Sequence, residues 1–497
     1  MDTEKTALQR KVVRIIFFSL LLDLLAFTMP LPLFPRLIAS FVEAEKSQQG
    51  TLLSRMLGFI QKSRAALLSL RASDLASYTT NSVTNNSKWD VTILGGLLGS
   101  IFSFCQFIVS PYIGRLSDGY GRRPVLLLTM VGNIASALLW LFSTSFGPYL
   151  LSRAIGGLSE GNVQLGIAII SDVSDPSTRA KSMALVGIAF SVCFTLGPSL
   201  GAWFAMNIPN GKAAEIGGIG LNIYAAPAAI TLAFLLVETV YLFIALPETK
   251  QYSETQTRIS SNATHHNQMS KPTTHRTLQQ RHERLKVLRK IHSLFLFFFS
   301  GAEFTLTFLT YDLYSFTNAQ NGRLLGLIGV LSSLLQGGYI RRSKKSPLGF
   351  VRTGVGACIL SLILLAALPL LHPGPSMAEG EMNTSSMLAL YSSAAALAYV
   401  SASVVNSLNT LASLECDEIQ GDPKQVDRAG IARGKALGDF RSAGQLGRAF
   451  GPLFATGIYW ARGPTLCYSV CACGSVAVYI LSRSLQDYKV EKPVKAE

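Results

Sequence analysis

Charged residues are scarce in this chain of 497 residues: Asp, Glu, Lys and Arg make up 15% of it, against about 25% in a typical soluble protein. Hydrophobic residues make up 49%, and they gather in long runs. A run of roughly 18 or more apolar residues is long enough for a helix to cross the hydrocarbon core of a bilayer. The composition therefore excludes an ordinary soluble domain and indicates a protein that crosses a membrane many times.

The sequence also lacks the usual equipment of an enzyme or of an ATP-driven protein. Its six histidines fall in loops or at the edges of the apolar runs, and no G-x-x-x-x-G-K-[ST] phosphate loop is present. Most of its seven cysteines lie inside apolar runs, which argues against a disulfide framework. The set Cys467, Cys471 and Cys473 is interpreted as small apolar filler rather than a metal site. We expect no enzymatic activity, no cofactor and no bound metal.

Twelve apolar runs are present, divided equally by one polar segment. The first six lie near 13–35, 91–113, 124–145, 148–171, 180–206 and 221–246, and the last six near 292–316, 322–340, 350–371, 387–412, 436–461 and 464–482. In lipid only helices and closed barrels satisfy the backbone, and these runs are too long for barrel strands. The predicted fold class is an all-α membrane protein of twelve transmembrane helices in two six-helix bundles.

The loops between the runs give the expected division of the chain. Residues 1–246 form the N-terminal bundle, which carries a long outer loop at 36–90, and residues 292–484 form the C-terminal bundle. The polar and basic segment 247–291 is interpreted as a cytoplasmic linker with a short surface helix at 277–290. Residues 485–497 form a cytoplasmic tail.

The net charge of +15 is unevenly distributed. Lys and Arg gather before the first run, in alternate loops and in the polar segment, whereas the remaining loops hold almost none. This bias marks the cytoplasmic side, so both termini are predicted to be cytoplasmic. The basic charge is explained by topology, and nucleic-acid binding is not expected. Sequons at Asn85 and Asn383 fall on the other side and are predicted glycosylation sites, whereas Asn262 in the linker should stay bare. No signal separates the plasma membrane from an endomembrane.

The two halves of the sequence echo each other. Gly197, Pro198 and Gly201 in the fifth run correspond to Gly451 and Pro452 in the eleventh, and these residues are expected to kink their helices. Asp23 and Glu303 also correspond, because each lies near the middle of the first run of its half. Parallel repeats of this kind are a building principle of secondary transporters.

The loop between the second and third runs carries the most specific motif. It reads Gly114-Arg-Leu-Ser-Asp118-Gly-Tyr-Gly121-Arg122-Arg123 and resembles the G-x-L-x-D-x-x-G-R-R/K signature of the major facilitator superfamily. Glycines allow a tight reversal, while Asp118 suits a helix N-terminus or a cation of the other half, and Arg122 suits an acid such as Asp172. The resemblance implies a gate at the cytoplasmic ends of two bundles that open a central cavity to alternate sides.

Further segments extend the resemblance over nearly the whole chain. Arg153 fits the fourth-helix arginine motif of the superfamily, and the residues from Gly187 to Gly201 fit the fifth-helix motif of its antiporters. The run from Asp23 to Pro35, together with Gly161-Asn-Val and Gly447-Arg-Ala-Phe-Gly-Pro452, is similar to the eukaryotic tetracycline-transporter-like members. This similarity implies export or uptake of organic anions. The corresponding turn at 338–342 lacks the aspartate, which argues against a symmetrical gate.

Charges inside the apolar runs are functional candidates, because a buried charge in a membrane is costly. Asp23 and Glu303 are predicted proton carriers, with pairing to a nearby arginine as the alternative. Arg153 and Arg448 are predicted to face the substrate, because guanidinium matches carboxylates and keeps its charge when desolvated; helix pairing is their alternative. Glu160 lies two turns after Arg153, and the two residues are also candidates for mutual neutralisation.

The tenth run is unusually polar around Asn406, which predicts a face that lines a cavity or joins helices. Glu238 in the sixth run has no evident partner in the sequence. We expect a monomer that takes a small organic anion or drug-like solute as its substrate, contacts membrane lipid and uses protons for coupling. The alternatives are an exporter of lipids or other amphiphiles, and a non-transporting receptor or assembly partner with the same fold.

Overall fold

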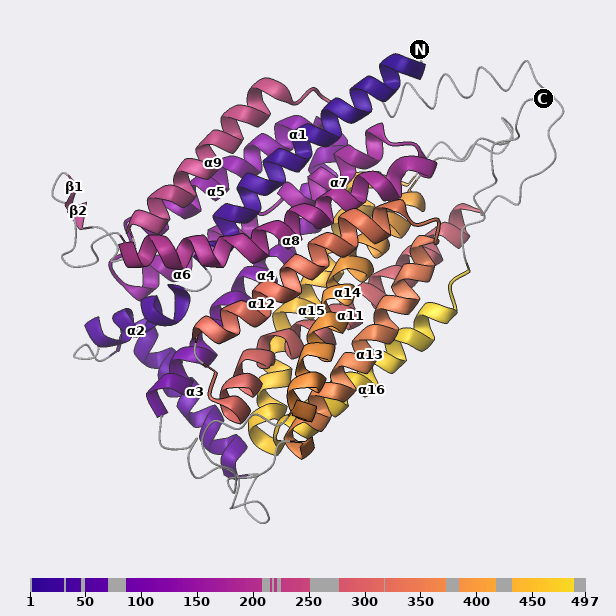
Figure 1. The fold of residues 1–497 in the computed structure, drawn as a ribbon. Coiled ribbons are helices and arrows are strands. Elements are labelled where there is room, and N and C mark those ends of the chain that lie inside the picture. Colours follow the sequence, from indigo (N-terminus) through magenta and orange to yellow (C-terminus); the bar gives the residue numbers. More distant parts are fainter. Residues whose placement is uncertain are drawn as a thin grey trace.

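The computed structural model forms two groups of long helices that run roughly along one direction (Figure 1). It describes residues 2–30, 33–45, 50–69, 86–207, 215–216, 219–220, 225–250, 277–316, 318–371, 384–416 and 431–486. The first group contains α1 (Asp2–Thr28), α2 (Phe34–Ala44), α3 (Leu52–Ser69), α4 (Asn86–Tyr120), α5 (Arg122–Leu141), α6 (Phe146–Ser159), α7 (Asn162–Val173), α8 (Pro176–Asn207) and α9 (Ala225–Ala245). The second contains α11 (Leu278–Tyr314), α12 (Asn318–Leu334) with its π-helical extension η2 (Leu335–Ile340), α13 (Pro347–Leu371), α14 (Thr384–Leu414), α15 (Arg433–Arg462) and α16 (Pro464–Arg483).

Nine helices within the described ranges carry a stretch long and apolar enough to cross a membrane. Two more, α1 and α15, run the same length but carry several charged residues. The fourth apolar run is divided into the short helices α6 and α7. Six crossing segments therefore precede the polar segment and six follow it, which confirms the predicted all-α membrane fold. Two short strands, β1 (Glu215–Ile216) and β2 (Ile219–Gly220), pair antiparallel between α8 and α9.

Helix ends differ from the predicted runs where proline or glycine intervenes. The first run was expected to continue to residue 35, but α1 ends at Thr28, directly before Met29-Pro30, because proline disfavours a helical residue before it. The fourth run breaks at Glu160 and Gly161, which lie between α6 and α7. Thr277 caps α11 through a reciprocal pair of hydrogen bonds with Gln280. Residues 278–291, expected in the linker, are therefore the first turns of the seventh crossing helix.

The fifth segment of each half packs closely on the first segment of the same half. A Cβ atom at Gly201 of α8 would overlap the carbonyl oxygen of Met29 at the end of α1. At Gly451 of α15, it would overlap the carbonyl oxygen of Phe297 in α11. Both helices continue through their prolines, Pro198 and Pro452. The repeat seen in the sequence thus corresponds to equivalent packing in the two halves.

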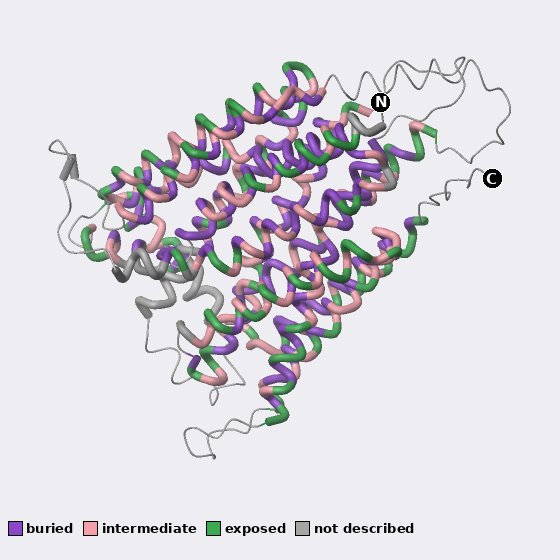
Figure 2. Tube along the Cα trace, turned by 45° about the horizontal axis from the view of Figure 1, so that its top comes forward, coloured by how far each residue is buried: buried purple, intermediate pink, exposed green. Residues whose placement is uncertain are grey.

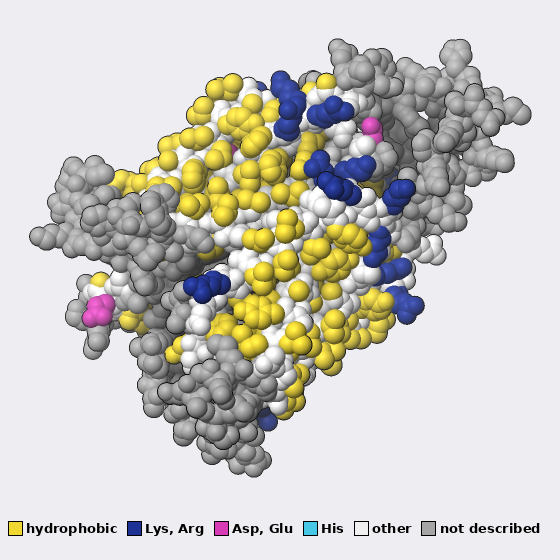
Figure 3. All heavy atoms as spheres, in the orientation of Figure 1, with side chains coloured by type: hydrophobic (Ala, Val, Ile, Leu, Met, Phe, Trp, Pro, Cys, Tyr) yellow, Lys and Arg dark blue, Asp and Glu magenta, His cyan; other side chains and the backbone are white. Residues whose placement is uncertain are grey.

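The surface of the bundle has an apolar belt. Large hydrophobic side chains such as Leu128, Ile244 and Leu370 are more than 60% exposed, while the buried residues lie between the helices (Figure 2). Hydrophobic side chains cover the middle of the face drawn in Figure 3, and Lys and Arg gather at the end of the bundle where α1 begins and α16 ends. A belt of this kind is what contact with hydrocarbon requires. We call the end where α1 begins and α16 ends the inner end.

The orientation gives a first testable prediction. Because the inner end collects the cations, it should face the cytoplasm. In cells that glycosylate, loss of a glycosidase-sensitive mass is expected on Asn85→Gln or Asn383→Gln, measured by gel mobility. Asn262→Gln is the matched control and should change nothing. A glycan on Asn262 would reverse the assigned orientation. All three asparagines lie outside the described residues.

Candidate functional site

Asp118 joins the two halves at the inner end. One carboxylate oxygen accepts the backbone N–H of Gly434 at 2.7 Å, and the other accepts the backbone N–H of Lys435 at 2.7 Å. Both donors belong to the first turn of α15, where unpaired N–H groups and the helix dipole favour a negative charge. The aspartate of the sequence motif thus caps a helix of the opposite half.

Arg122 and Asp172 extend this contact into a chain of charges. Arg122 donates to Asp118 at 2.8 Å and to Asp172 at 2.9 Å. Asp172, at the end of α7, also accepts from Arg433 of α15 at 2.6 Å. Two carboxylates and two guanidinium groups therefore alternate across the boundary between the halves. Arg433 was not singled out in the sequence, because it lies in a basic loop with no motif of its own.

The turn that presents Asp118 depends on glycine. Gly121 has φ +102°, in the left-handed region that favours glycine, and the Glu248 carboxylate accepts the backbone N–H groups of Arg122 and Arg123 that follow. The Arg123 guanidinium lies 5.4 Å from the ring centre of Phe243, on α9. Glu248 thus supplies the N-terminal cap that α5 needs.

A second line of contact joins the two halves through α8 of the first half and α12 and α14 of the second. Ser191 of α8 and Ser332 of α12 share a hydrogen bond of 2.9 Å, and Arg179 of α8 donates to the carbonyl oxygen of Ser413 in α14 at 3.3 Å. Asn406 lies where a Cβ atom on Gly187 would overlap its side chain. Asn406, which was predicted to line a cavity or to join helices, therefore lies at the boundary between α14 and α8.

Replacing Asp118 by Asn should weaken the closed inner end. The amide keeps the volume but loses the charge and one acceptor, and hydrogen bonds to charged groups contribute about 1.5–3 kcal/mol each. We expect normal membrane abundance with turnover reduced about tenfold, measured as solute exchange in proteoliposomes. Asp439→Asn is the matched control, because Asp439 pairs with Arg289 of its own half at 2.9 Å. Equal turnover in both variants would show that the charge of Asp118 has no role in transport.

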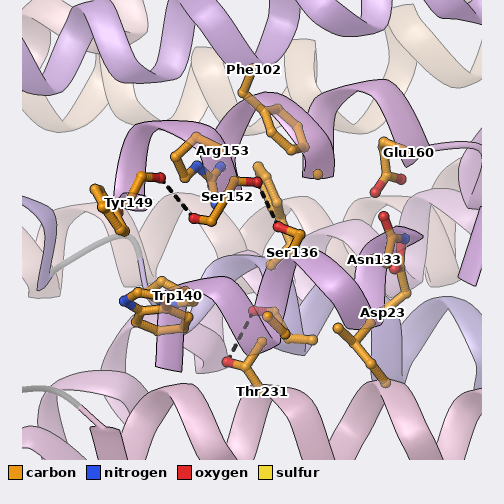
Figure 4. A pocket seen from close by; sticks show the side chains of 16 residues that line it. Asp23, Phe102, Asn133, Ser136, Trp140, Tyr149, Ser152, Arg153, Glu160 and Thr231 are labelled. Carbon is orange, nitrogen blue, oxygen red and sulfur yellow. Dashed lines mark hydrogen bonds between the residues drawn. The ribbon is translucent and has the colours of Figure 1, made fainter. Parts of the chain in front are cut away.

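An open pocket lies inside the N-terminal half. Its walls come from α1, α4, α5, α6 and α9 and combine aromatic, hydroxyl and charged side chains (Figure 4). The lining includes Asp23, Phe27, Phe102, Asn133, Ser136, Trp140, Tyr149, Ser152, Arg153, Glu160 and Thr231. Ser136 donates to the carbonyl oxygen of Ser152 at 2.7 Å and thereby fixes α5 against α6.

Arg153 is the cation of this pocket. Its guanidinium lies 4.6 Å from the ring centre of Phe102 and 6.0 Å from that of Phe27. Guanidinium groups stack on aromatic faces, which hold the plane of the group in place. Glu160 lines the same pocket beyond the end of α6 and interacts electrostatically with Arg153. Arg153 and Glu160 thus share one pocket, as their spacing on the predicted helix suggested, although Glu160 lies at the break.

Asp23 lies at the end of this pocket, beside residues that the sequence did not connect with it. Asn162, in the first turn of α7, donates to the Asp23 carboxylate at 2.7 Å. The same amide lies 3.5 Å from an oxygen of Glu238, which also accepts from Ser19 at 2.7 Å. Glu238, without a partner in the sequence, is therefore next to Asp23 in the fold. In the sequence, the only feature that marked Glu238 as a functional candidate was its position inside an apolar run.

A second group of charges lies on α15. Arg448 interacts electrostatically with Glu303 of α11 and with Arg441, and Arg441 interacts with Asp23 and Glu160 across the boundary. The Glu303 side chain is exposed, whereas Asp23 is buried. Arg441 also lines a very small cavity between α7, α14 and α15. Sequence reasoning missed Arg441, although it lies seven residues before Arg448 in the same apolar run.

A closed inner end, a pocket lined by charged and aromatic side chains and two repeated six-helix halves define a transporter that exposes its pocket to alternate sides of a membrane. Residues 16–421 match the family model of the Major Facilitator Superfamily. The chain belongs to this superfamily, as the signature at Gly114–Arg123 indicated. It is an integral multi-pass membrane protein and a secondary transporter.

Individual relatives agree with this assignment. The chain is 32% identical over 479 residues to mouse major facilitator superfamily domain-containing protein 10, covering 94% of this chain and 91% of the relative. The crystal structure of the human organic anion transporter MFSD10 (TETRAN) matches with a TM-score of 0.69 and 29% identity, over 95% of this chain and 99% of that one. The class B tetracycline resistance protein of Escherichia coli is 32% identical over 108 residues, 22% of this chain and 27% of the relative.

Proposed function

We propose that the protein moves a small amphipathic organic anion, or a drug-like solute of similar chemistry, across its membrane by alternating access, with protons as the coupling ion. The observation that carries this proposal is the pocket around Arg153. It combines a guanidinium group that suits a carboxylate or sulfonate with the aromatic rings of Phe27, Phe102, Trp140 and Tyr149. Such a pocket fits a ligand with one charged end and one apolar end. The organic anion transporter and tetracycline resistance relatives support the same ligand class.

The contacts at the inner end support a gating role for the signature motif. In this structure the contacts between α4 and α15 extend from Gly114 and Gly434 to the ring pair of Phe104 and Phe450, whose centres are 6.4 Å apart. The pocket is therefore shielded from the inner end. Transport requires these contacts to break while the outer ends close. The alternating charges around Asp118 stabilise the closed state and fix the relative position of the two halves in it.

Arg448 is proposed as a second cation for the substrate. It lies on α15 in the other half, so an anion that bridges Arg153 and Arg448 would draw the two halves together. Arg448→Lys keeps the charge but loses the planar fork that binds a carboxylate with two hydrogen bonds. This variant should raise KM while leaving membrane abundance unchanged. Glu303 is proposed to hold Arg448 in place through their electrostatic contact.

Flux into proteoliposomes tests the proposed function. Purified protein is reconstituted, and uptake of a panel of labelled organic anions is measured at two external pH values. Saturable uptake of at least one anion, inhibited by others, is the expected result. Competition by phospholipid but not by small anions would favour the lipid exporter. Absence of flux for every solute, from protein that is folded and inserted, would favour the non-transporting receptor.

A further inference from the structure

The amide of Asn162 connects two carboxyl groups that lie deep in the N-terminal half. It donates to Asp23 at 2.7 Å and lies 3.5 Å from Glu238, and the three side chains are 2%, 4% and 0% exposed in the order Asn162, Asp23, Glu238. The break between α6 and α7 places Asn162 at a helix start, where its side chain reaches both α1 and α9. Two carboxylates this close repel each other strongly in a medium of low polarity.

One oxygen of Glu238 is left without a partner. Oε1 accepts from Ser19 at 2.7 Å, whereas Oε2 is fully buried and has no hydrogen-bond partner among the described residues. An ionised carboxylate with an unpaired buried oxygen is costly, and a proton on that oxygen removes most of the cost. Within the described part of the chain, the electrostatic neighbours of Glu238 are the carboxyl groups of Asp23 and Glu160, and no cation is among them.

Several charged side chains form a network with Asp23, because each interacts either with Asp23 or with another member. The positive and negative charges of this network do not balance. Among the residues that the structure describes, four carboxyl groups belong to this network: Asp23, Glu160, Glu238 and Glu303. Three guanidinium groups oppose them: Arg153, Arg441 and Arg448. His292 faces Arg441 and Arg448 and is counted as neutral, because a third positive charge there would meet two others. Four negative charges against three positive ones leave room for one proton.

Apart from Glu160 and Arg441, the other polar groups that the described residues place near the two carboxyls carry no charge. They are the hydroxyl of Ser19 on α1, the thioether of Met130 on α5, the amide of Asn162 on α7 and the thiol of Cys193 on α8. Arg153 and Arg441 face Glu160, and Arg441 also faces Asp23. The extra proton therefore belongs with Glu238 and Asp23 rather than with Glu160 or Glu303.

We propose that Asp23 and Glu238 form one binding site for a single shared proton, and that this proton is the one coupled to transport. The proposal rests on the proposed transport function. Asp23 lines the pocket and Glu238 does not, so a proton reaches the pair from the pocket through Asp23. Binding changes the charge of the pair from −2 to −1, and release when the pocket opens to the other side reverses that change. No other bond is made or broken.

The test separates coupling from transport itself. Proteoliposomes with the membrane potential clamped by K⁺ and valinomycin are used for two measurements with one labelled anion. Exchange at equal pH on both sides reports transport, and accumulation under a pH gradient of either sign reports coupling. One coupled proton per anion allows about tenfold accumulation for each pH unit. Glu238→Gln keeps the charge of the protonated pair, so exchange at equal pH should persist but lose the pH dependence of the wild type, and accumulation should fall to about onefold.

Two further variants sharpen the result. Asp312→Asn is the matched control, since Asp312 is another carboxyl of the bundle but binds Tyr459, at 2.7 Å, outside the network; it should accumulate as the wild type does. Ser19→Ala keeps both carboxyls and removes the hydroxyl from Glu238, so its pH profile of exchange should move toward alkaline pH by up to about one unit. This variant replaces Glu238→Gln as the test if the latter is not monodisperse.

Several outcomes would overturn the shared proton site. Full accumulation by Glu238→Gln is one, and an unchanged pH profile in Ser19→Ala is another. Loss of accumulation in Glu303→Gln together with its retention in Glu238→Gln would place the proton on the other half. Accumulation driven by a Na⁺ gradient instead of a pH gradient would assign the site to a metal cation. Absence of exchange in the wild type would instead count against the proposed function.

Discussion

Gly114→Ala is expected to abolish turnover by preventing closure of the inner end. A Cβ atom on Gly114 would overlap the backbone carbonyl of Gly434, and a Cβ atom on Gly434 would overlap that of Gly114. Neither backbone is free to move, because Asp118 binds the first turn of α15 directly beside this contact. Overpacking of this kind costs about 1–3 kcal/mol or more, and here only the closed state incurs that cost.

Folding should survive the same substitution. Alanine in a helix is about 1 kcal/mol more favourable than glycine, so the open state is stabilised slightly. Solute exchange in proteoliposomes should fall more than tenfold at equal abundance. A cysteine at Leu437, buried on α15, should become reactive to a membrane-impermeant maleimide from the inner side. Gly119→Ala is the control on the same helix, since a Cβ atom there meets nothing within 4 Å. Normal exchange by Gly114→Ala would contradict a closed state that needs backbone contact.

The second large effect is expected at Arg153. Arg153→Gln removes the charge from the pocket and should raise KM for an organic anion about 10- to 100-fold, because a hydrogen bond to a charged group contributes about 1.5–3 kcal/mol. Arg153→Lys keeps the charge but loses the planar group that stacks on Phe102, and an intermediate effect of about tenfold is expected.

Initial rates over a range of substrate concentrations measure both variants. Arg462→Gln is the matched control: Arg462 is an exposed arginine at the last turn of α15 and should leave KM unchanged. If the Arg153 variants lowered the maximal rate but left KM as it was, Arg153 would serve the conformational change rather than recognition. The helix-pairing alternative for Arg153 would then be favoured.

The sequence predicted those features of the fold and of the site that a single local pattern of residues determines. Apolar runs of membrane length set the number of crossing helices, because the lipid leaves the backbone few other choices. The spacing from Gly114 to Arg123 pointed to the contact between the halves, and the structure pairs Arg122 with Asp172, the acid named for it from the sequence, at 2.9 Å. The break at Glu160 and the early end of α1 were harder to predict, since both depend on where glycine and proline meet a packed neighbour.

The roles of the intramembrane carboxyls could not be ranked in the same way. Asp23 and Glu303 occupy corresponding positions in sequence, yet one is buried beside a second carboxyl and the other is exposed beside an arginine. An internal repeat fixes the backbone path of each half but not the side chains that pack around a given position. The symmetrical assignment of two proton carriers therefore stays a sequence prediction, and we favour Asp23 with Glu238.

The sequence by itself determined that this protein is a membrane-spanning member of its superfamily, because composition, charge bias and one motif are local properties. Only the tertiary structure decided which groups act together. Asp118 meets Gly434, Asn162 meets Asp23 and Glu238, and Arg441 faces the carboxyls of the other half. The partners in these sets are far apart along the chain, and their meeting depends on helix rotation and depth, which side-chain packing sets and apolar runs leave open.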